Sequence, residues 1–291
     1  MRLMSYRRDG QRGWGLAVGE GADAGIVELG PRVGARWPDL ASALAAGALS
    51  ELARYAALAP DVALEAVVFE PPVPRPPKIL CVGVNYRDRN EEYRDGAEAP
   101  RYPSLFMRSP WSFTGHGQPL VRPPESVQLD YEGEIAIVIG RGGRRIPAAR
   151  AREHVAGLTV LNEGTIRDWL RHGKFNVTQG KNFDRTGAIG PWLVTTDALP
   201  AFDALRVITR VNGELRQDDT TDRLMFPFEF LIEYVSTFAT LEPGDVISTG
   251  TPTGAGARFD PPKWLVPGDV VEVEVPGIGV LRNGIVDEVT P

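Results

Sequence analysis

The chain has 291 residues, of which 43% are hydrophobic, and its formal net charge is −6. This length suits one large domain, or a main domain with a small appendage. The acidic balance argues against a nucleic-acid partner, and no apolar run approaches the roughly 20 residues of a membrane span. The single cysteine, Cys81, excludes an internal disulfide, and the N-terminus lacks the apolar core of a signal peptide. We therefore expect a cytoplasmic protein.

The first 70 residues have the pattern of a small leading unit. Short strands are predicted over 14–18 and 24–29, and a helical stretch over 39–57. Five prolines then fall between Pro71 and Pro77, where they predict a stiff extended connector, since proline fits neither a helix interior nor a central strand. We expect a small N-terminal domain over 1–70 and a catalytic domain over 71–291.

The remainder of the chain is divided by frequent glycines and prolines, which favours many short strands. Strands are predicted over 78–84, 129–139, 155–161, 205–211, 245–249 and 269–275, and a helix over 227–237. Asn212-Gly213 predicts a hairpin turn. Pro-Gly-Asp occurs at 243–245 and again at 267–269, each time opening a strand. The expected fold class is α+β, mostly β.

Three acids alternate along the predicted strand over 129–139. Asp130, Glu132 and Glu134 would share one strand face, where their charges repel unless a cation lies among them. Mg²⁺ and Mn²⁺ prefer oxygen ligands, so a hard divalent metal is the simplest solution. The alternative is a solvated outer face of an antiparallel strand.

Four motifs occur in a fixed order along the chain. They are Asp-Tyr-Glu-x-Glu at 130–134, Asn-Glu-x-x-x-Arg-Asp at 162–168, Gly-Lys-Asn-Phe-Asp at 180–184 and Thr-Gly-Thr-Pro-x-Gly at 249–254. Together they resemble the fumarylacetoacetate hydrolase family over roughly residues 71–288, and the leading unit is similar to the short N-terminal domain of bacterial members. The resemblance implies a mixed β-roll, a homodimer and a Mg²⁺ or Mn²⁺ cofactor.

The resemblance also implies a site. Glu132, Glu134 and Glu163 would be the metal ligands, while Asp130 matches no ligand of the family. Glu163 departs from the usual aspartate, and its extra methylene would need a shifted metal or a different rotamer. The alternative for Glu163 alone is a surface acid of a loop.

Four more residues would face the substrate. Lys181 would stabilise negative charge developing on a substrate oxygen, or else be a surface lysine. Arg167 would contact the substrate carboxylate or brace the metal-binding acids, and a purely structural brace with Asp168 is the alternative. Thr251 would offer its hydroxyl and nearby backbone N–H groups, although a lone glycine-rich loop is weak evidence. Tyr86 is a further predicted substrate contact.

The residues that would transfer protons in the predicted active site depart from the family pattern. Hydrolytic members carry a His and, three residues on, a Glu that together activate water. Here Arg89 occupies the His position and Glu92 the Glu position, and arginine cannot act as an ordinary base. A family Gln is replaced by Leu170. Either Glu92 acts alone, or His116 or His172 serves as base, or the chain does not hydrolyse and Arg89 clamps a substrate carboxylate.

The leading interpretation is a metal-dependent hydrolase that cleaves a carbon–carbon bond in an acylpyruvate or 2,4-dioxo acid, with a small-molecule oxo acid as its substrate. A close second is a decarboxylase or an enol–keto isomerase of a 2-oxo diacid, because those reactions need a metal more than an activated water. A third is a catalytically altered member that binds a ligand or serves a biosynthetic role. The charged segment 87–103 is predicted to select the substrate's side chain.

Overall fold

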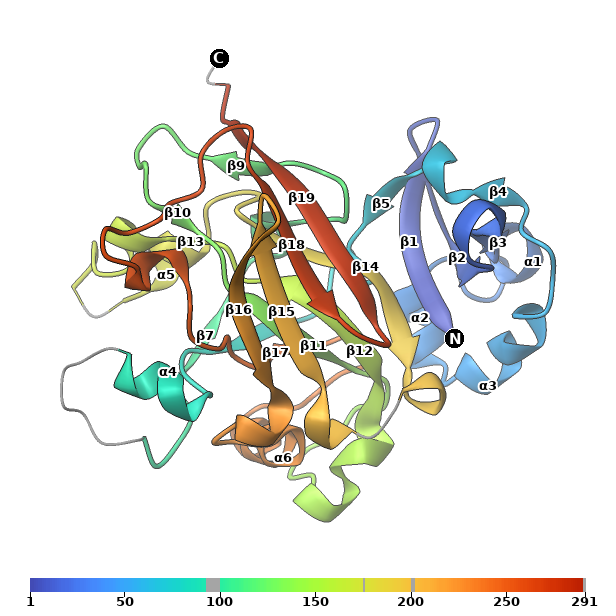
Figure 1. Ribbon diagram of the computed structural model, residues 1–291. Helices are drawn as coiled ribbons and strands as arrows, with labels where there is room; N and C mark the ends of the chain where they lie inside the picture. The colour runs from blue at the N-terminus through green and yellow to red at the C-terminus, as the bar shows by residue number, and fades with distance from the viewer. Residues whose placement is uncertain (93–99, 175, 200–201, 290–291) are drawn as a thin grey trace.

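The computed structural model describes residues 1–92, 100–174, 176–199 and 202–289. Within them, twelve strands form one large sheet (Figure 1). Its ordered path is β4 (Val62–Ala63), β3 (Gly25–Glu28), β2 (Gln11–Val18), β1 (Arg2–Arg8), β14 (Gly187–Thr195), β12 (Val155–Asn162), β11 (Gly133–Ile139), β17 (Val246–Ser248), β6 (Ile79–Val82) and β7 (Leu105–Met107). Outside this path, β5 (Val68–Glu70) pairs with β1, and β8 (Phe113–Thr114) pairs with β14.

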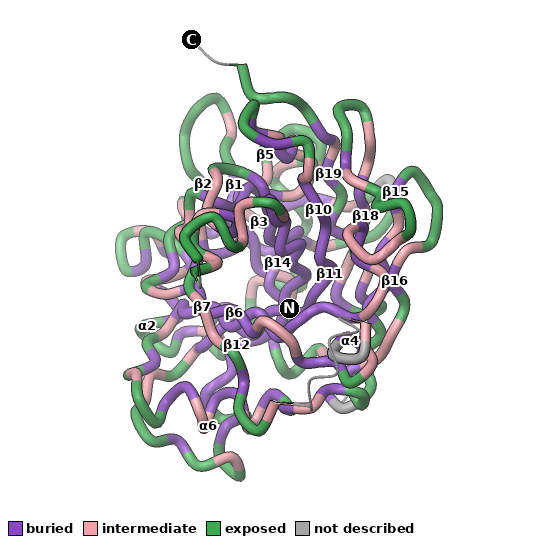
Figure 2. The backbone as a smooth tube through the Cα atoms, turned by 90° about the vertical axis from the view of Figure 1, so that its left-hand side faces the viewer, coloured by how far each residue is buried: buried purple, intermediate pink, exposed green. Residues whose placement is uncertain are grey.

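A second sheet covers the middle of the first. Its path is β16 (Glu214–Thr220), β15 (Arg206–Val211), β18 (Val270–Val275), β19 (Gly279–Asp287) and β9 (Leu120–Arg122). It packs against β11, β12 and β14, and the apolar core between the layers includes Ile135, Leu158 and Val273. Because β11 and β12 are covered on both sides, they are buried along their whole length (Figure 2). Most pairs are antiparallel and a few are parallel, which confirms the mixed, mostly β fold.

The helices are short and lie outside the sheets. They are α1 (Gly30–Val33), α2 (Leu40–Ala45), α3 (Leu49–Leu52), α4 (Arg87–Glu91), α5 (Thr178–Lys181) and α6 (Phe228–Phe238). The predicted helix over 227–237 is α6, which begins directly after Pro227, as a proline at a helix start allows. In the part of the chain that the structure describes, no helix is long and apolar enough to span a membrane.

The leading unit continues the main sheet. β1 pairs with β14 through Leu3 and Leu193, and Trp14 belongs to the same apolar cluster as Leu193 and Val246. No helix or strand covers 71–77, as expected for the proline-rich connector. The domain boundary after residue 70 stays a prediction.

The predicted turns form as expected. Asn212 and Gly213 have φ of 52° and 80° and join β15 to β16, which is the positive-φ pair of a tight hairpin. Gly244 and Gly268 both have positive φ, and the aspartate after each accepts a backbone N–H, from Glu242 at 2.7 Å and from Val266 at 2.9 Å. The two Pro-Gly-Asp segments therefore form the same kind of turn.

The acid-bearing strand is interrupted, unlike the continuous strand predicted over 129–139. Leu129–Asp130 forms β10, which pairs with β13 (Thr165–Ile166), and β11 begins only at Gly133. Side chains replace strand partners at the break: Asn162 accepts the N–H of Glu132 at 3.0 Å and Gln217 accepts that of Gly133 at 2.9 Å. The break lets the chain pass from the two-stranded sheet of β10 and β13 to the twelve-stranded sheet that contains β11.

Candidate active site

Three glutamates meet where β11 and β12 lie side by side. Gly133 is the register partner of Asn162, and the N–H of Glu163 donates to the carbonyl of Glu132 at 2.8 Å. This pairing brings Glu163 to the start of β11, and one carboxylate oxygen each of Glu132, Glu134 and Glu163 lies within 4.8 Å of the others. The structure thus brings together the three predicted metal ligands.

Every acid of this segment is buried, so the alternative of a solvated strand face is wrong. The exposed fractions are 4% for Glu132, 1% for Glu134 and 1% for Glu163. Asp130 is also buried, but it lies outside the cluster of three and accepts from the N–H groups of Gly256 at 2.8 Å and Ala257 at 3.0 Å. Its separation from the predicted ligands is as expected.

Cationic side chains surround Glu132. The Nζ of Lys181 donates to Glu132 Oε2 at 2.6 Å and to Glu163 Oε2 at 2.8 Å. Arg167 bridges two acids, with Nη2 at 2.7 Å from Glu132 Oε1 and Nε at 2.7 Å from Asp130 Oδ2. The ammonium of Lys181 therefore lies between two of the three predicted ligands, and Arg167 braces an acid of the cluster, as one of the predictions for it stated.

The three glutamates differ electrostatically. Burial opposes ionisation of Glu132, but the charges of Arg167, Lys181 and Arg89 outweigh burial and hold its pKa well below the usual range. Burial and the charges of Glu163 and Glu132 raise the pKa of Glu134 well above that range. Burial likewise raises the pKa of Glu163, against the opposing charges of Lys181 and Arg108. A divalent cation among these oxygens would relieve the repulsion that Glu134 experiences.

Further donors fix the orientation of the cluster. Glu134 Oε2 accepts from the hydroxyl of Ser248 and, at 2.8 Å, from the N–H of Gly250. Glu163 Oε1 accepts from Arg108 Nη1 at 3.0 Å. Sequence reasoning missed Arg108, because one arginine at the end of a short strand has no distinguishing pattern. Gly250 lies in the fourth motif, over 249–254, and Ser248 directly precedes it; the motif itself predicts only Thr251 as a contact.

A cavity of about 610 Å³ opens onto the cluster. Its lining includes Glu132, Arg167 and Lys181, together with Leu170 and apolar residues of β7. This volume suits a small organic acid. One carboxylate of the acid cluster, Glu132, and the cations Arg167 and Lys181 thus face one space.

Arg89 has a different environment from that of a water-activating histidine. It is 1% exposed, donates to Glu92, and places Nη2 at 3.2 Å from Glu132 Oε1. Glu92 also accepts from the N–H of Gly254 at 3.0 Å and lies 4.0 Å from Arg258. Both family positions are therefore engaged in an ionic network, and residues 93–99 of the predicted substrate-selecting segment lie outside the described residues.

Two predicted substrate contacts are engaged within the protein. The hydroxyl of Thr251 donates to the carbonyl of Gly133 at 2.9 Å and accepts from Gln217 at 2.9 Å. Tyr86 is 1% exposed and belongs to the main apolar core. Their substrate-binding roles stay predictions.

The alternative bases lie elsewhere. His172 stacks on Trp169 with ring centroids 4.0 Å apart, and His116 accepts from the N–H of Arg282. Neither lines the cavity at Glu132. Cys81 is fully buried, and burial raises the pKa of its thiol well above the ordinary value, which fits the predicted structural role.

The chain is similar to proteins of one known family. Residues 78–286 match the family described as fumarylacetoacetate (FAA) hydrolase C-terminal. The chain is 45% identical over 226 residues to the oxaloacetate tautomerase YisK of Bacillus subtilis, covering 76% of this chain and 74% of that protein. It is 37% identical over 294 residues to the human mitochondrial oxaloacetate tautomerase FAHD2A, covering 98% of this chain and 92% of that protein.

A solved structure provides a metal-bound comparison. Maleylpyruvate hydrolase from Sphingobium sp. SYK-6, in complex with manganese(II) ion and pyruvate, superposes with a TM-score of 0.77 at 27% identity, covering 99% of this chain and all of that one. Three clustered carboxylates are a donor set that suits such a cation. The buried oxygens of this chain therefore fit a divalent metal, and the chain belongs to the fumarylacetoacetate hydrolase family.

Proposed function

We propose that the protein is a divalent-metal-dependent tautomerase that interconverts the enol and keto forms of a 2-oxo dicarboxylic acid of the oxaloacetate type. The proposal is supported by the acid cluster, by the cavity of about 610 Å³ beside it, and by the cations that line that cavity. It also agrees with the names of the two tautomerases to which the chain is similar.

The observation that favours tautomerisation over hydrolysis is the position of Arg89. A hydrolase of this family type needs a base that activates water, and here the corresponding side chain is a buried arginine paired with Glu92 and Glu132. No histidine of the described residues lines the cavity. Tautomerisation moves one proton between the C2 oxygen and the neighbouring carbon, and it needs no water as a reactant.

The residues divide the work between binding and proton transfer. Glu132, Glu134 and Glu163 would hold Mg²⁺ or Mn²⁺, which when bound would polarise the 2-oxo group of the substrate. Arg167 offers a guanidinium at the cavity wall for a substrate carboxylate. Lys181, protonated at Nζ, stabilises negative charge developing on the substrate oxygen. Glu92 does not line the cavity and contacts Arg89, which in turn contacts Glu132. Because it keeps the family position, it is the proposed group that accepts the hydroxyl proton of the enol and returns a proton to the carbon.

Carbon–carbon hydrolysis is the second candidate. Glu92 is retained at the family position, and the chain has the fold of a maleylpyruvate hydrolase. In this reading Glu92 alone would activate water. The identity of the metal as Mg²⁺ or Mn²⁺ stays a prediction. So do the homodimer and the cytoplasmic location.

The two candidates are separated by their products. With Mn²⁺ present, we expect the enzyme to speed the decay of the enol absorbance of freshly dissolved oxaloacetate, without releasing pyruvate or carbon dioxide above the uncatalysed rate. Acylpyruvates should release no pyruvate. Glu163→Gln should abolish the effect, whereas Glu214→Gln, an exposed ion-paired acid of β16, should retain it. Pyruvate release from an acylpyruvate, with no effect on the enol, would overturn the proposal in favour of hydrolysis.

A further inference from the structure

A second cavity, of about 340 Å³, lies where the leading unit meets the main domain. It is built from the proline-rich connector, from the end of β1 and the start of β2, and from the 3-10 turn at 110–112. Four arginines line it, Arg7, Arg12, Arg75 and Arg185, together with one acidic residue, Glu70. The cavity therefore has an excess of positive charge and is unrelated to the acid cluster at Glu132.

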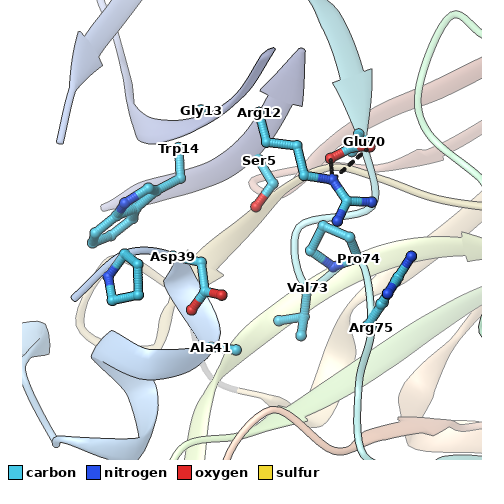
Figure 3. A pocket seen from close by; sticks show the side chains of 11 residues that line it. Ser5, Arg12, Gly13, Trp14, Asp39, Ala41, Glu70, Val73, Pro74 and Arg75 are labelled. Atoms are coloured by element: carbon cyan, nitrogen blue, oxygen red, sulfur yellow. Dashed lines mark hydrogen bonds and ion pairs between the residues drawn. The ribbon is translucent and has the colours of Figure 1, made fainter. Parts of the chain in front are cut away.

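The four arginines differ in their pairing. Arg7 donates to Glu70 at 2.7 Å, and Arg12 places Nε at 3.2 Å from the other oxygen of the same carboxylate. Arg75 and Arg185 are exposed, and neither pairs with a carboxylate of the described residues. Two guanidiniums thus remain available for an anion, while Glu70 holds the other two in place. Figure 3 shows Arg12 paired with Glu70, with Pro74 and Arg75 beside them.

The remaining walls are flat and apolar. Trp111 is 64% exposed, and the guanidinium of Arg75 lies over its ring, 5.3 Å from the centroid. Pro71, Pro74 and Pro110 form further parts of the lining. Exposed indole and proline surfaces stack well against a planar ring, and an arginine can continue such a stack.

A smaller cavity of about 130 Å³ adjoins the arginine-lined cavity and shares Arg12, Glu70, Pro74 and Arg75 with it. Its wall includes Trp14, which is 2% exposed and whose indole N–H has no hydrogen-bond partner among the described residues (Figure 3). Its lining also includes a second carboxylate, Asp39, so the excess of positive charge belongs to the larger cavity alone.

We propose that the cavity of about 340 Å³ is a binding site for a small planar anion, an aromatic ring bearing a carboxylate or a phosphate. Arg75 and Arg185 bind the anionic group through charge-assisted hydrogen bonds. Trp111 and the connector prolines cover the ring. The size of the larger cavity suits a ligand of this class. The site is independent of the proposed tautomerase activity.

The probe for this site is phenyl phosphate, titrated calorimetrically into the full chain with Mn²⁺ present. Phenol and inorganic phosphate are the comparators. Each should bind at least tenfold more weakly, because phenol lacks the anionic group and inorganic phosphate lacks the ring. Arg75→Ala and Arg185→Ala should each weaken phenyl phosphate binding about tenfold or more. Trp111→Ala should weaken phenyl phosphate while leaving inorganic phosphate unchanged.

Two controls keep the result specific. Arg206→Ala removes an exposed, ion-paired arginine of β15 and should bind phenyl phosphate as the wild type does. Arg167→Ala removes a cation of the other cavity and should also leave binding unchanged. The proposal is wrong if the wild type binds no phenyl phosphate, or if Arg75→Ala and Arg185→Ala bind it normally. It is also wrong if binding is abolished by Arg167→Ala or by an excess of oxalate, a small dianion that would compete at the cavity beside Glu132. Thermal unfolding of each variant confirms that it is folded.

Discussion

Arg108 and Glu163 form an ion pair of 3.0 Å in which the two side chains are 0% and 2% exposed. Arg108 also donates to the carbonyl of Gly164 at 2.9 Å and to the hydroxyl of Ser112 at 3.0 Å. One buried guanidinium thus ties the end of β7 to the segment that follows β12. It holds a predicted metal ligand without lining the cavity itself.

Removing that guanidinium should destabilise the fold. Arg108→Met leaves Glu163 buried with one cation fewer, and breaking a buried pair costs about 3–5 kcal/mol. Urea unfolding measures the difference. Arg206→Met, which breaks an exposed pair with Asp218, should change the free energy of unfolding by about 1 kcal/mol or less. If the two variants were equally stable, the proposed brace would be absent.

The acid cluster should bind Mn²⁺ in the folded state. At a free metal concentration of about 100 times Kd, binding adds about 2.7 kcal/mol to the free energy of unfolding. Glu134→Gln should weaken Mn²⁺ binding by at least about tenfold, because it removes one of three anionic ligands. The electron paramagnetic resonance signal of free Mn²⁺ gives the affinity. Glu214→Gln is the control, and a normal affinity in Glu134→Gln would exclude Glu134 as a ligand.

Restoring the family residues should introduce hydrolysis. In Arg89→His combined with Leu170→Gln, a titratable base stands beside Glu92, and a positioned base contributes roughly 10²-fold or more to such a step. Release of pyruvate from an acylpyruvate should therefore rise from background to a measurable rate. Arg89→Lys keeps the positive charge and should give no such rate. No pyruvate from the double variant, with Mn²⁺ bound normally, would mean that hydrolysis is limited elsewhere.

Protonation of His116 should destabilise the protein. Burial, with the charge of Arg282, lowers its pKa below the ordinary 6.5, and its Nδ1 accepts from the backbone N–H of Arg282 at 3.2 Å. As the pH falls through 6.5, the unfolded chain takes up the proton first, so the free energy of unfolding decreases until the folded-state pKa is passed. The stabilising contribution is complete above that window.

The substitution His116→Asn tests this dependence, because asparagine keeps an acceptor but does not titrate. Urea unfolding at about pH 7.5 and about pH 5.5 should show a smaller loss of stability for His116→Asn than for the wild type. His172→Asn, at an exposed histidine, should behave as the wild type does. An unchanged loss in His116→Asn would contradict the assignment.

A side chain at position 133 should destabilise the fold. A Cβ at this position would lie 2.1 Å from Thr209 Oγ1 and 3.0 Å from a methyl carbon of Val273. Gly133→Ala should therefore cost about 1–3 kcal/mol and displace Glu132 and Glu134, which weakens Mn²⁺ binding. Adding Thr209→Ala removes the nearest obstacle and should restore part of both losses. If the double variant were no better than Gly133→Ala, the clash with Thr209 would not be the cause.

The sequence by itself determined the elements whose causes are local. The positive-φ hairpin at Asn212, the start of α6 after Pro227 and the two Pro-Gly-Asp turns depend on residues next to one another in the chain. The motifs also identified the family and brought Glu132, Glu134 and Glu163 forward as one predicted set. Local chemistry and motif order were sufficient for these conclusions.

Tertiary structure decided what depends on pairing between distant segments. Only the register of β11 with β12 places Glu163 beside Glu132, and only packing buries Arg108 against it. The strand predicted over 129–139 is broken because Asn162 and Gln217, remote in sequence, accept its N–H groups. Likewise, the excess of guanidinium groups around Glu70 exists because the first strands fold onto the connector. Charge, burial and hydrogen bonding at these sites are properties of neighbours in space, which the order of residues does not give.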